Sequence, residues 1–156
     1  MTTKDNTVRD ANGSMAPTNE SGTFDLDGEL TVNRLGFGAM RLCGEGIIGP
    51  PDDEQAAKEV VQEAVDLGVD FIDTADSYGP GVSERLLDEA IDTEEVTIAT
   101  KAGLLRNSDG QWLNHADPDY IRNQVLVSRD RLGVDSIDLY QLHSPDPDTP
   151  FEDSLT

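Results

Sequence analysis

Positive charge is scarce in this sequence, and the scarcity excludes two large classes of partner. Among 156 residues, 11 are Lys or Arg and 32 are Asp or Glu, so the formal net charge is −21. So acidic a surface repels phosphate backbones and anionic lipids, and we therefore expect neither nucleic acid nor a membrane as a partner. At ~1 M salt the screening length falls to ~3 Å, which removes most of the repulsion between like charges. The composition favours a salt-adapted (halophilic), cytoplasmic protein over one that binds a specific cationic partner.

Cysteine and long apolar runs are scarce too. Cys43 is the single cysteine, so the chain can form no internal disulfide. The two histidines, His115 and His143, do not combine with it at the spacing of a zinc site, and we expect no metal. No apolar run approaches the ~18 residues of a membrane-spanning helix. The N-terminus has no basic start followed by an apolar block, which argues against a signal peptide.

The N-terminal region divides into a polar tail and a hairpin. Residues 1–21 are polar and aperiodic, which predicts a disordered tail before a folded region at 22–156. Two short apolar runs, 23–26 and 29–32, flank Asp27-Gly28. Asp-Gly between such runs favours a two-residue hairpin turn, because both positions adopt a positive φ.

After the hairpin, strand and helix patterns alternate. A further apolar run at 35–40 is followed by strands expected at 69–74, 96–100 and 137–142, and by helices at 52–67, 82–91 and 118–132. Asp117 with Pro118 marks a helix start, and Gly68 and Gly133 mark helix ends. Residues 103–116 are expected to form a long loop. This alternation indicates a parallel α/β sheet with helices outside it.

The spacing of the strands resembles a barrel that is only half present. Strand starts recur at an interval comparable to the ~31 residues per unit of an eight-unit barrel of ~250 residues. About four βα units are present, and the Thr149–Glu152 capping box announces a fourth helix just before the chain ends. We therefore expect the N-terminal half of a TIM (β/α)8 barrel, preceded by a β-hairpin and truncated at the start of the fourth helix. A complete small α/β domain with a frayed tail is the alternative.

Ionisable side chains follow the predicted strands to one end of the sheet. Because side chains alternate along a strand, Asp73, Lys101 and His143 continue the faces that point into a barrel. Tyr78 follows in the loop after the second of these strands. The carboxyl ends of barrel strands carry the chemistry of such folds. Each residue alone has an ordinary explanation, as a turn aspartate, a packed aromatic, a strand-end histidine or a surface lysine, but together they predict a site.

Lys101 is the most informative of the four. A lysine at the end of a buried strand needs an anionic partner, and Asp73 is the natural candidate. A buried ammonium group beside a tyrosine favours the phenolate, so we expect Lys101 to lower the pKa of Tyr78 from about 10. A tyrosine tuned in this way can exchange a proton near neutral pH.

Four segments together resemble the aldo-keto reductases: Leu35–Met40, Phe71–Gly79 with Ser83-Glu84, Ile98–Ala102 and Asp138–His143. The resemblance implies an eight-stranded α/β barrel with an N-terminal hairpin, and an NADPH- or NADH-dependent reduction of aldehydes or ketones. It gives Tyr78 the role of general acid, with Lys101 tuning it, Asp73 holding Lys101 and His143 orienting the carbonyl.

The same resemblance implies the cofactor contacts, which would be Gly38, Ala39, Met40 and Asp73. The family's contacts to the remainder of the cofactor come from the second half of the barrel, which this sequence lacks. We therefore expect the 156 residues to be inactive alone, with self-association through the open sheet edges as one possibility.

The loop with Trp112 and His115 is a candidate wall of the pocket for a small-molecule carbonyl substrate, with Trp112 as its aromatic member. The stretch Gly110-Gln-Trp-Leu113 resembles a prokaryotic branch of the family that includes pyridoxal-type reductases. Two other functions stay open: an aldolase that uses Lys101 to form a Schiff base, and a non-catalytic remnant or cofactor-sensing subunit.

Overall fold

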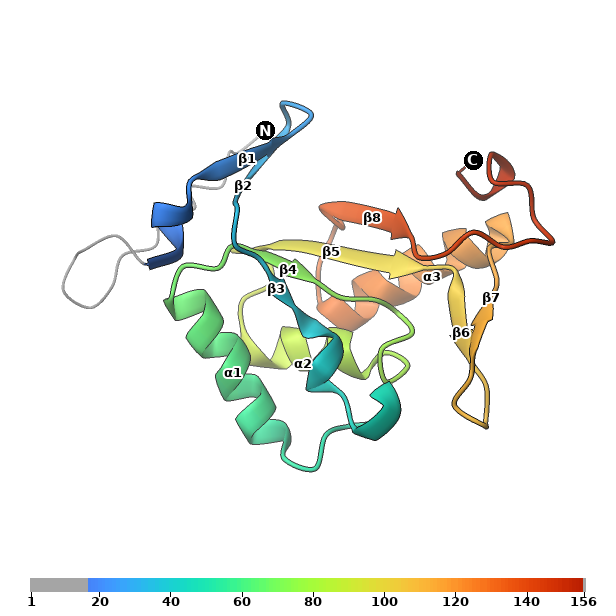
Figure 1. Cartoon of the computed structure of the whole chain (residues 1–156), viewed down its shortest axis with the longest axis horizontal. Helices are drawn as coiled ribbons and strands as arrows, with labels where there is room; N and C mark the ends of the chain where they lie inside the picture. The colour runs from blue at the N-terminus through green and yellow to red at the C-terminus, as the bar shows by residue number, and fades with distance from the viewer. Residues whose placement is uncertain (1–16, 156) are drawn as a thin grey trace.

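The computed structural model describes residues 17–155, which are built around a four-stranded parallel sheet. The strands are β3 (Phe37–Gly38), β4 (Phe71–Asp73), β5 (Thr97–Ala102) and β8 (Leu139–Leu142), and they lie side by side in this order. The connecting helices are α1 (Glu54–Asp66), α2 (Val82–Ala90) and α3 (Pro118–Leu132). All three lie on the same side of the sheet (Figure 1). The predicted α/β alternation is confirmed, and the arrangement is that of a partial barrel.

Local capping fixes where the helices begin and end. The Asp53 carboxylate accepts a hydrogen bond from the Ala56 N–H at 2.9 Å, and α1 begins at Glu54, directly after Asp53. Asp117 caps α3 in the same way, with Pro118 at the first helical position, and Gly133 ends that helix with a φ of 66°. Within residues 17–155, no helix combines the length and apolar character needed to cross a membrane.

The main core lies between the sheet and the three helices. Ile72 and Ile98 enter it from the strands and are at most 2% exposed, while Val61, Leu87 and Leu132 enter it from the helices and are fully buried. Burial of a side chain of this size stabilises the fold by about 1.5–3 kcal/mol. Because side chains alternate along a strand, residues next to Ile72 and Ile98, such as Asp73 and Ala99, face the opposite side of the sheet.

The N-terminal hairpin forms, but with a longer turn than predicted. β1 (Thr23–Leu26) pairs antiparallel with β2 (Leu30–Asn33), and Leu26 lies opposite Leu30. The turn therefore has three residues, 27–29, instead of two. Asp27 and Gly28 have the expected positive φ values of 59° and 76°. Glu29 joins the turn because the strand pairing stops at Leu30.

Part of the predicted tail is ordered. Residues 1–16 lie outside the described residues, so the prediction of disorder is not tested there. Pro17–Ser21 differs from the prediction, because it forms a short 3-10 helix. The Thr18 hydroxyl, in a residue 6% exposed, donates to the Leu67 carbonyl at 2.7 Å. This bond ties the segment to the end of α1.

The predicted loop at 103–116 contains a second hairpin. β6 (Leu104–Arg106) pairs antiparallel with β7 (Trp112–Asn114), and Leu105 lies opposite Leu113. This hairpin projects from the end of the sheet where β5 finishes (Figure 1). The sequence did not indicate it because each strand has three residues, too few to show a periodic pattern.

The segment with the predicted fourth helix start is also different. Asp153–Leu155 forms a 3-10 turn in place of the first turn of an α-helix. The Ser154 hydroxyl donates to the Ala116 carbonyl at 3.0 Å, and this contact holds the turn against the start of α3.

Candidate active site

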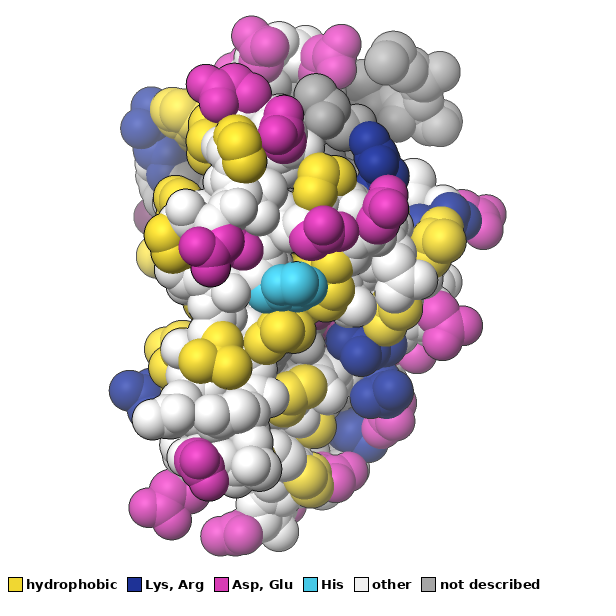
Figure 2. Space-filling view, turned by 90° about the vertical axis from the view of Figure 1, so that its right-hand side faces the viewer, with side chains coloured by type: hydrophobic (Ala, Val, Ile, Leu, Met, Phe, Trp, Pro, Cys, Tyr) yellow, Lys and Arg dark blue, Asp and Glu magenta, His cyan; other side chains and the backbone are white. Residues whose placement is uncertain are grey.

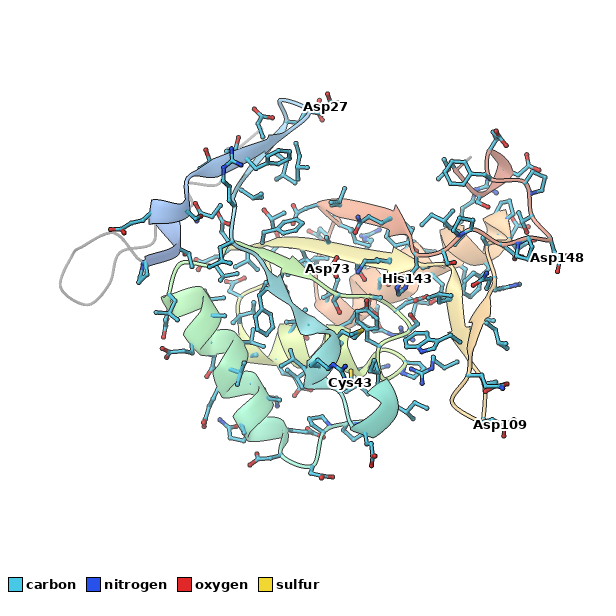
Figure 3. All side chains as sticks on the ribbon, viewed as in Figure 1. Asp27, Cys43, Asp73, Asp109, His143 and Asp148 are labelled. Carbon is cyan, nitrogen blue, oxygen red and sulfur yellow. The ribbon has the colours of Figure 1, made fainter. Side chains whose placement is uncertain are left out.

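The four predicted side chains come together at the carboxyl end of the sheet. Asp73 is the last residue of β4, Lys101 lies one residue before the end of β5, and His143 directly follows β8. Figure 3 shows Asp73 and His143 at the same end of the sheet. Tyr78 reaches this end from the loop between β4 and α2. The strand alternation thus brings Asp73, Lys101 and His143 to one end of the sheet, and Tyr78 joins them from its loop.

Lys101 is held by a carboxylate and a carbonyl. Its Nζ lies 2.6 Å from Asp73 Oδ1 and 2.8 Å from the Thr74 carbonyl oxygen. The Lys101 side chain is 13% exposed, whereas that of Asp73 is 39% exposed. The ammonium group is therefore largely removed from water with its charge compensated, and the carboxylate stays accessible from outside.

Tyr78 lies against both Lys101 and His143. Its ring centroid is 5.3 Å from Lys101 Nζ and 5.6 Å from the His143 ring centroid, with the two rings nearly perpendicular. Tyr78 is 6% exposed and packs in a small cluster with Cys43 and Ala75. The turn that carries it requires glycine at position 79, where φ is 72° and an added Cβ would lie 2.5 Å from Val82 Cβ.

The expectation that Lys101 lowers the pKa of Tyr78 is wrong for this structure. The pKa of Tyr78 is raised above its usual value, first because the phenol is buried and second because the Asp73 carboxylate is close. Lys101, whose ammonium group is paired with Asp73 at 2.6 Å, does not outweigh these two effects. Tyr78 is therefore a protonated phenol at neutral pH, which is the form a general acid needs.

His143 is neutral at the same pH. Burial, followed by the positive charge of Lys101, lowers the pKa of His143 to about 4. Its Nδ1 lies 3.4 Å from the Ser77 hydroxyl. A neutral imidazole carries one N–H, so His143 can donate a hydrogen bond while accepting another.

Asp76 belongs to a buried network that sequence reasoning missed. It is 4% exposed, and its carboxylate accepts a hydrogen bond from the Tyr120 hydroxyl at 3.1 Å. Burial raises the pKa of Asp76 to about 6. Arg131 Nη1 lies next to it and pairs with Glu84 at 3.2 Å. Position 76 falls inside the Asp73–Tyr78 segment, but Tyr120 and Arg131, which contact it, come from α3, so only the fold identifies it.

Trp112 reaches the site from the second hairpin. Its ring centroid is 6.4 Å from those of Tyr78 and His143, and the residue is 40% exposed. The structure thus brings the predicted aromatic residue to the predicted acid. His115, the other residue of this loop, instead packs against Tyr120 with ring centroids 4.7 Å apart.

The predicted cofactor contacts line one edge of this site. Gly38 pairs with Asp73 across β3 and β4, and an added Cβ there would meet nothing within 4 Å, so open space adjoins its backbone. Met40 packs against the cluster around Tyr78. Ala39 is fully buried, and its carbonyl accepts from the Ser83 hydroxyl at 3.4 Å, so its side chain faces the core. The open space at Gly38, beside the partly exposed Asp73 carboxylate, leaves room for a ligand to approach the backbone.

Figure 2 shows the end of the molecule where the parallel strands finish. A histidine side chain lies at this surface, with hydrophobic side chains beside and below it and acidic side chains close above it and at the edges. Among the described residues, no group of three or more His, Cys, Asp or Glu side chains is placed to hold a metal ion.

Comparison with known proteins gives consistent matches. Residues 34–156 match the model of the aldo/keto reductase family. An uncharacterized oxidoreductase of Schizosaccharomyces pombe is 44% identical over 147 residues, covering 94% of this chain and 48% of the relative. The pyridoxine 4-dehydrogenase of Escherichia coli is 43% identical over 124 residues, covering 78% of this chain and 43% of the relative.

Solved structures agree with the sequence matches. An aldo-keto reductase of Bacillus halodurans in its holo form aligns with a TM-score of 0.71 at 34% identity, over 85% of this chain and 43% of that one. The chain therefore spans less than half the length of each of these three proteins.

Proposed function

The chain belongs to the aldo/keto reductase family, and from this we propose that it carries the catalytic side chains of an enzyme that reduces aldehydes or ketones to alcohols with NADPH or NADH. The observation that supports this most is the convergence of Tyr78, Lys101, Asp73 and His143 at one end of the sheet. Since the chain spans less than half of its relatives, we propose that these residues act within a complete barrel and that the chain alone is inactive.

Tyr78 would act as the general acid. Bound nicotinamide coenzyme supplies the hydride that reduces the carbonyl carbon. Tyr78 Oη donates its proton to the carbonyl oxygen, and water later returns a proton to the phenolate. The Lys101 ammonium, 5.3 Å from the ring centroid, stabilises the negative charge as it develops on the phenol. Burial and the Asp73 carboxylate act in the opposite direction and keep the resting pKa of Tyr78 raised.

His143 would orient the substrate. Because its pKa is about 4, the imidazole is neutral at pH 7 and donates one hydrogen bond to the carbonyl oxygen. A charged imidazolium would instead compete with Tyr78 as proton donor. The contact between Nδ1 and Ser77 helps to fix the ring.

Asp73, Gly38 and Met40 would hold the nicotinamide end of the coenzyme. Asp73 combines an exposed carboxylate with a role as partner of Lys101. The open space at Gly38 allows a ligand to approach the backbone. Ala39 would contribute through its backbone only, because its side chain is in the core. The preference for NADPH over NADH rests on the family alone.

Trp112 would form a wall of the substrate pocket. Its position beside Tyr78 and His143 supports this role. The 43% identity with a pyridoxine 4-dehydrogenase supports a pyridoxal-type aldehyde as substrate.

The two alternative functions receive no support from the comparisons. An aldolase would need a Lys101 amine free to attack a carbonyl, but Nζ is bound by Asp73 and Thr74. A remnant or cofactor-sensing subunit has no support among the relatives described above.

Self-association, salt adaptation, a prokaryotic source and a cytoplasmic location stay predictions. In the four-stranded sheet, β3 and β8 are the edge strands, and this supports pairing with a second chain or segment. The net charge of −21 supports salt adaptation.

Substitution of Tyr78 tests the proposed reaction. A chimera would join this chain to the remaining length of the E. coli relative, and coenzyme oxidation with pyridoxal would be followed at 340 nm. We expect Tyr78→Phe to lower kcat by about 10³-fold, because the proton donor is lost while ring packing is kept. Coenzyme affinity should change less than about twofold.

Tyr140→Phe is the matched control, since the Tyr140 hydroxyl donates to the Ile121 carbonyl away from the site. The control should keep its activity. A Tyr78→Phe chimera that retains normal turnover would refute the assignment of Tyr78 as the acid.

A further inference from the structure

Arg106, the last residue of β6, connects three segments around the site. Its Nη1 donates to the Ile47 carbonyl at 2.9 Å, and its Nη2 donates to the Gly46 and Gly110 carbonyls at 2.8 Å each. Its guanidinium carbon also lies 3.8 Å from the centroid of the Trp112 ring. One side chain thus fixes the 45–47 segment, the turn of the second hairpin and the indole.

The choice of partners is unusual for so acidic a chain. Among the described residues, Arg106 takes part in no salt bridge, although carboxylates outnumber cations almost threefold in the sequence. Its guanidinium group instead contacts backbone carbonyls and the face of an aromatic ring, and such a face attracts cations through its quadrupole. These contacts hold neighbouring segments in place. They also leave Arg106 without a pair of N–H groups for an anionic ligand, because three of its hydrogen bonds go to carbonyls and Nε is buried.

The bonds of Arg106 also lead to the loop of Tyr78. The Ile47 carbonyl accepts a second hydrogen bond from the Gly79 N–H at 3.2 Å. Ile47 has a φ of 61°, a conformation that is strained for a β-branched residue and persists only where surrounding contacts hold it. Arg106 supplies one of these contacts. It therefore reaches the site by two routes, through Trp112 and through Ile47 to the residue after Tyr78.

We propose that Arg106 is a positioning residue that holds the Trp112 indole beside Tyr78 and His143, and that this gives the site a preference for flat aromatic carbonyl compounds over saturated ones. The proposal rests on the proposed function for its substrate class. A fixed indole offers an aromatic substrate a favourable ring contact, at stacked or edge-to-face geometry, that a saturated ring of similar size lacks. A mobile indole would offer both substrates only apolar surface.

Trp112 is the single tryptophan of the chain, so tryptophan fluorescence reports the surroundings of this indole alone. We expect Arg106→Gln to increase the acrylamide quenching constant of Trp112 about twofold, and Arg106→Lys to give an intermediate value. Lysine keeps the charge but lacks the planar group and the paired donors. Circular dichroism of each variant would verify the fold. If the glutamine variant unfolds, the quenching constant of Arg106→Lys still tests the proposal.

Arg122→Gln is the matched control, because Arg122 is exposed and its ion pair within residues 17–155 is with Asp119 one turn away, at 3.1 Å. Its quenching should equal that of the unmodified chain. Equal quenching in folded Arg106 variants and in the control would overturn the proposal.

A pair of ligands tests the preference. The probes are pyridine-4-carboxaldehyde and cyclohexanecarboxaldehyde, titrated into the chain by calorimetry. We expect Arg106→Gln to weaken binding of the aromatic aldehyde about fivefold and binding of the saturated one less than twofold. Equal changes for both, or no binding of the aromatic aldehyde to the unmodified chain, would overturn the proposal.

Binding in this assay needs neither coenzyme nor turnover, so it separates the two conclusions. An aromatic preference that depends on Arg106, in a chimera that oxidises no coenzyme, would refute the proposed function and leave the role of Arg106 standing. Normal turnover of the chimera, with no effect of Arg106→Gln on the preference for the aromatic aldehyde, would refute the role of Arg106 and leave the proposed function standing.

Discussion

Two cations approach the site from different sides, and they differ in what surrounds them. Lys101 meets a carboxylate at 2.6 Å, whereas Arg106 meets three backbone carbonyls and the face of Trp112. Lys101 touches the ring of Tyr78 directly, but Arg106 reaches it through Trp112. The Lys101 ammonium lies close enough to Tyr78 to stabilise negative charge that develops on the phenol during a reaction. The contacts of Arg106 fix shape instead.

Removal of the Lys101 charge should have the largest effect. We expect Lys101→Met, in the chimera described above, to lower kcat by about 10²–10³-fold with a smaller change in KM, because the interaction is strongest in the transition state. Lys58→Met is the matched control, since Lys58 pairs with Glu89 between α1 and α2, away from the site. If Lys101→Met kept the same activity as Lys58→Met, the proposed catalytic role of the Lys101 charge would be refuted.

The pH dependence of stability sharpens the comparison, because two buried groups near these cations act in opposite directions. His143 has a pKa lowered to about 4, so the unfolded state binds its proton first, and stability is lost as pH falls from about 6.5 to 4. Asp76 has a pKa raised to about 6, so the folded state binds its proton first, and stability is lost as pH rises from about 4 to 6. The two effects should largely cancel in the unmodified chain.

Asp76→Asn should expose the contribution of His143. We expect the free energy of unfolding of this variant to rise by about 2 kcal/mol between pH 4 and 6.5, relative to a flatter curve for the unmodified chain, as measured by urea denaturation. His143→Asn should show the opposite slope. Parallel curves for all three proteins would contradict the assigned directions.

The sequence predicted those elements that depend on neighbours along the chain. Asp117 with Pro118 and Gly133 are local signals, and α3 begins and ends where they stand. Strand alternation placed Lys101 on the face of Asp73 because the sheet is parallel and its register brings the two ends together. This pattern was enough to assemble the candidate site.

Features that depend on distant partners could not be predicted. The Asp76 network joins the loop after β4 to Tyr120 on α3. The β6–β7 hairpin is local, but its three-residue strands are too short to show a periodic pattern. The direction of the Tyr78 pKa depends on burial and on how closely Asp73 neutralises Lys101, and neither distance nor burial is written in the spacing of residues.

The ionisation of Tyr78 is the most direct test of the central claim. This claim is that the phenol stays protonated, beside a Lys101 ammonium paired with Asp73, until it reacts. The chain has three tyrosines, so ¹³Cζ-tyrosine NMR with Tyr78→Phe for assignment can follow the one signal through a pH titration. The account predicts that Tyr78 becomes a phenolate only above the usual value of about 10. A midpoint below that value would contradict it and would show that Lys101 acts on Tyr78 as an unpaired charge.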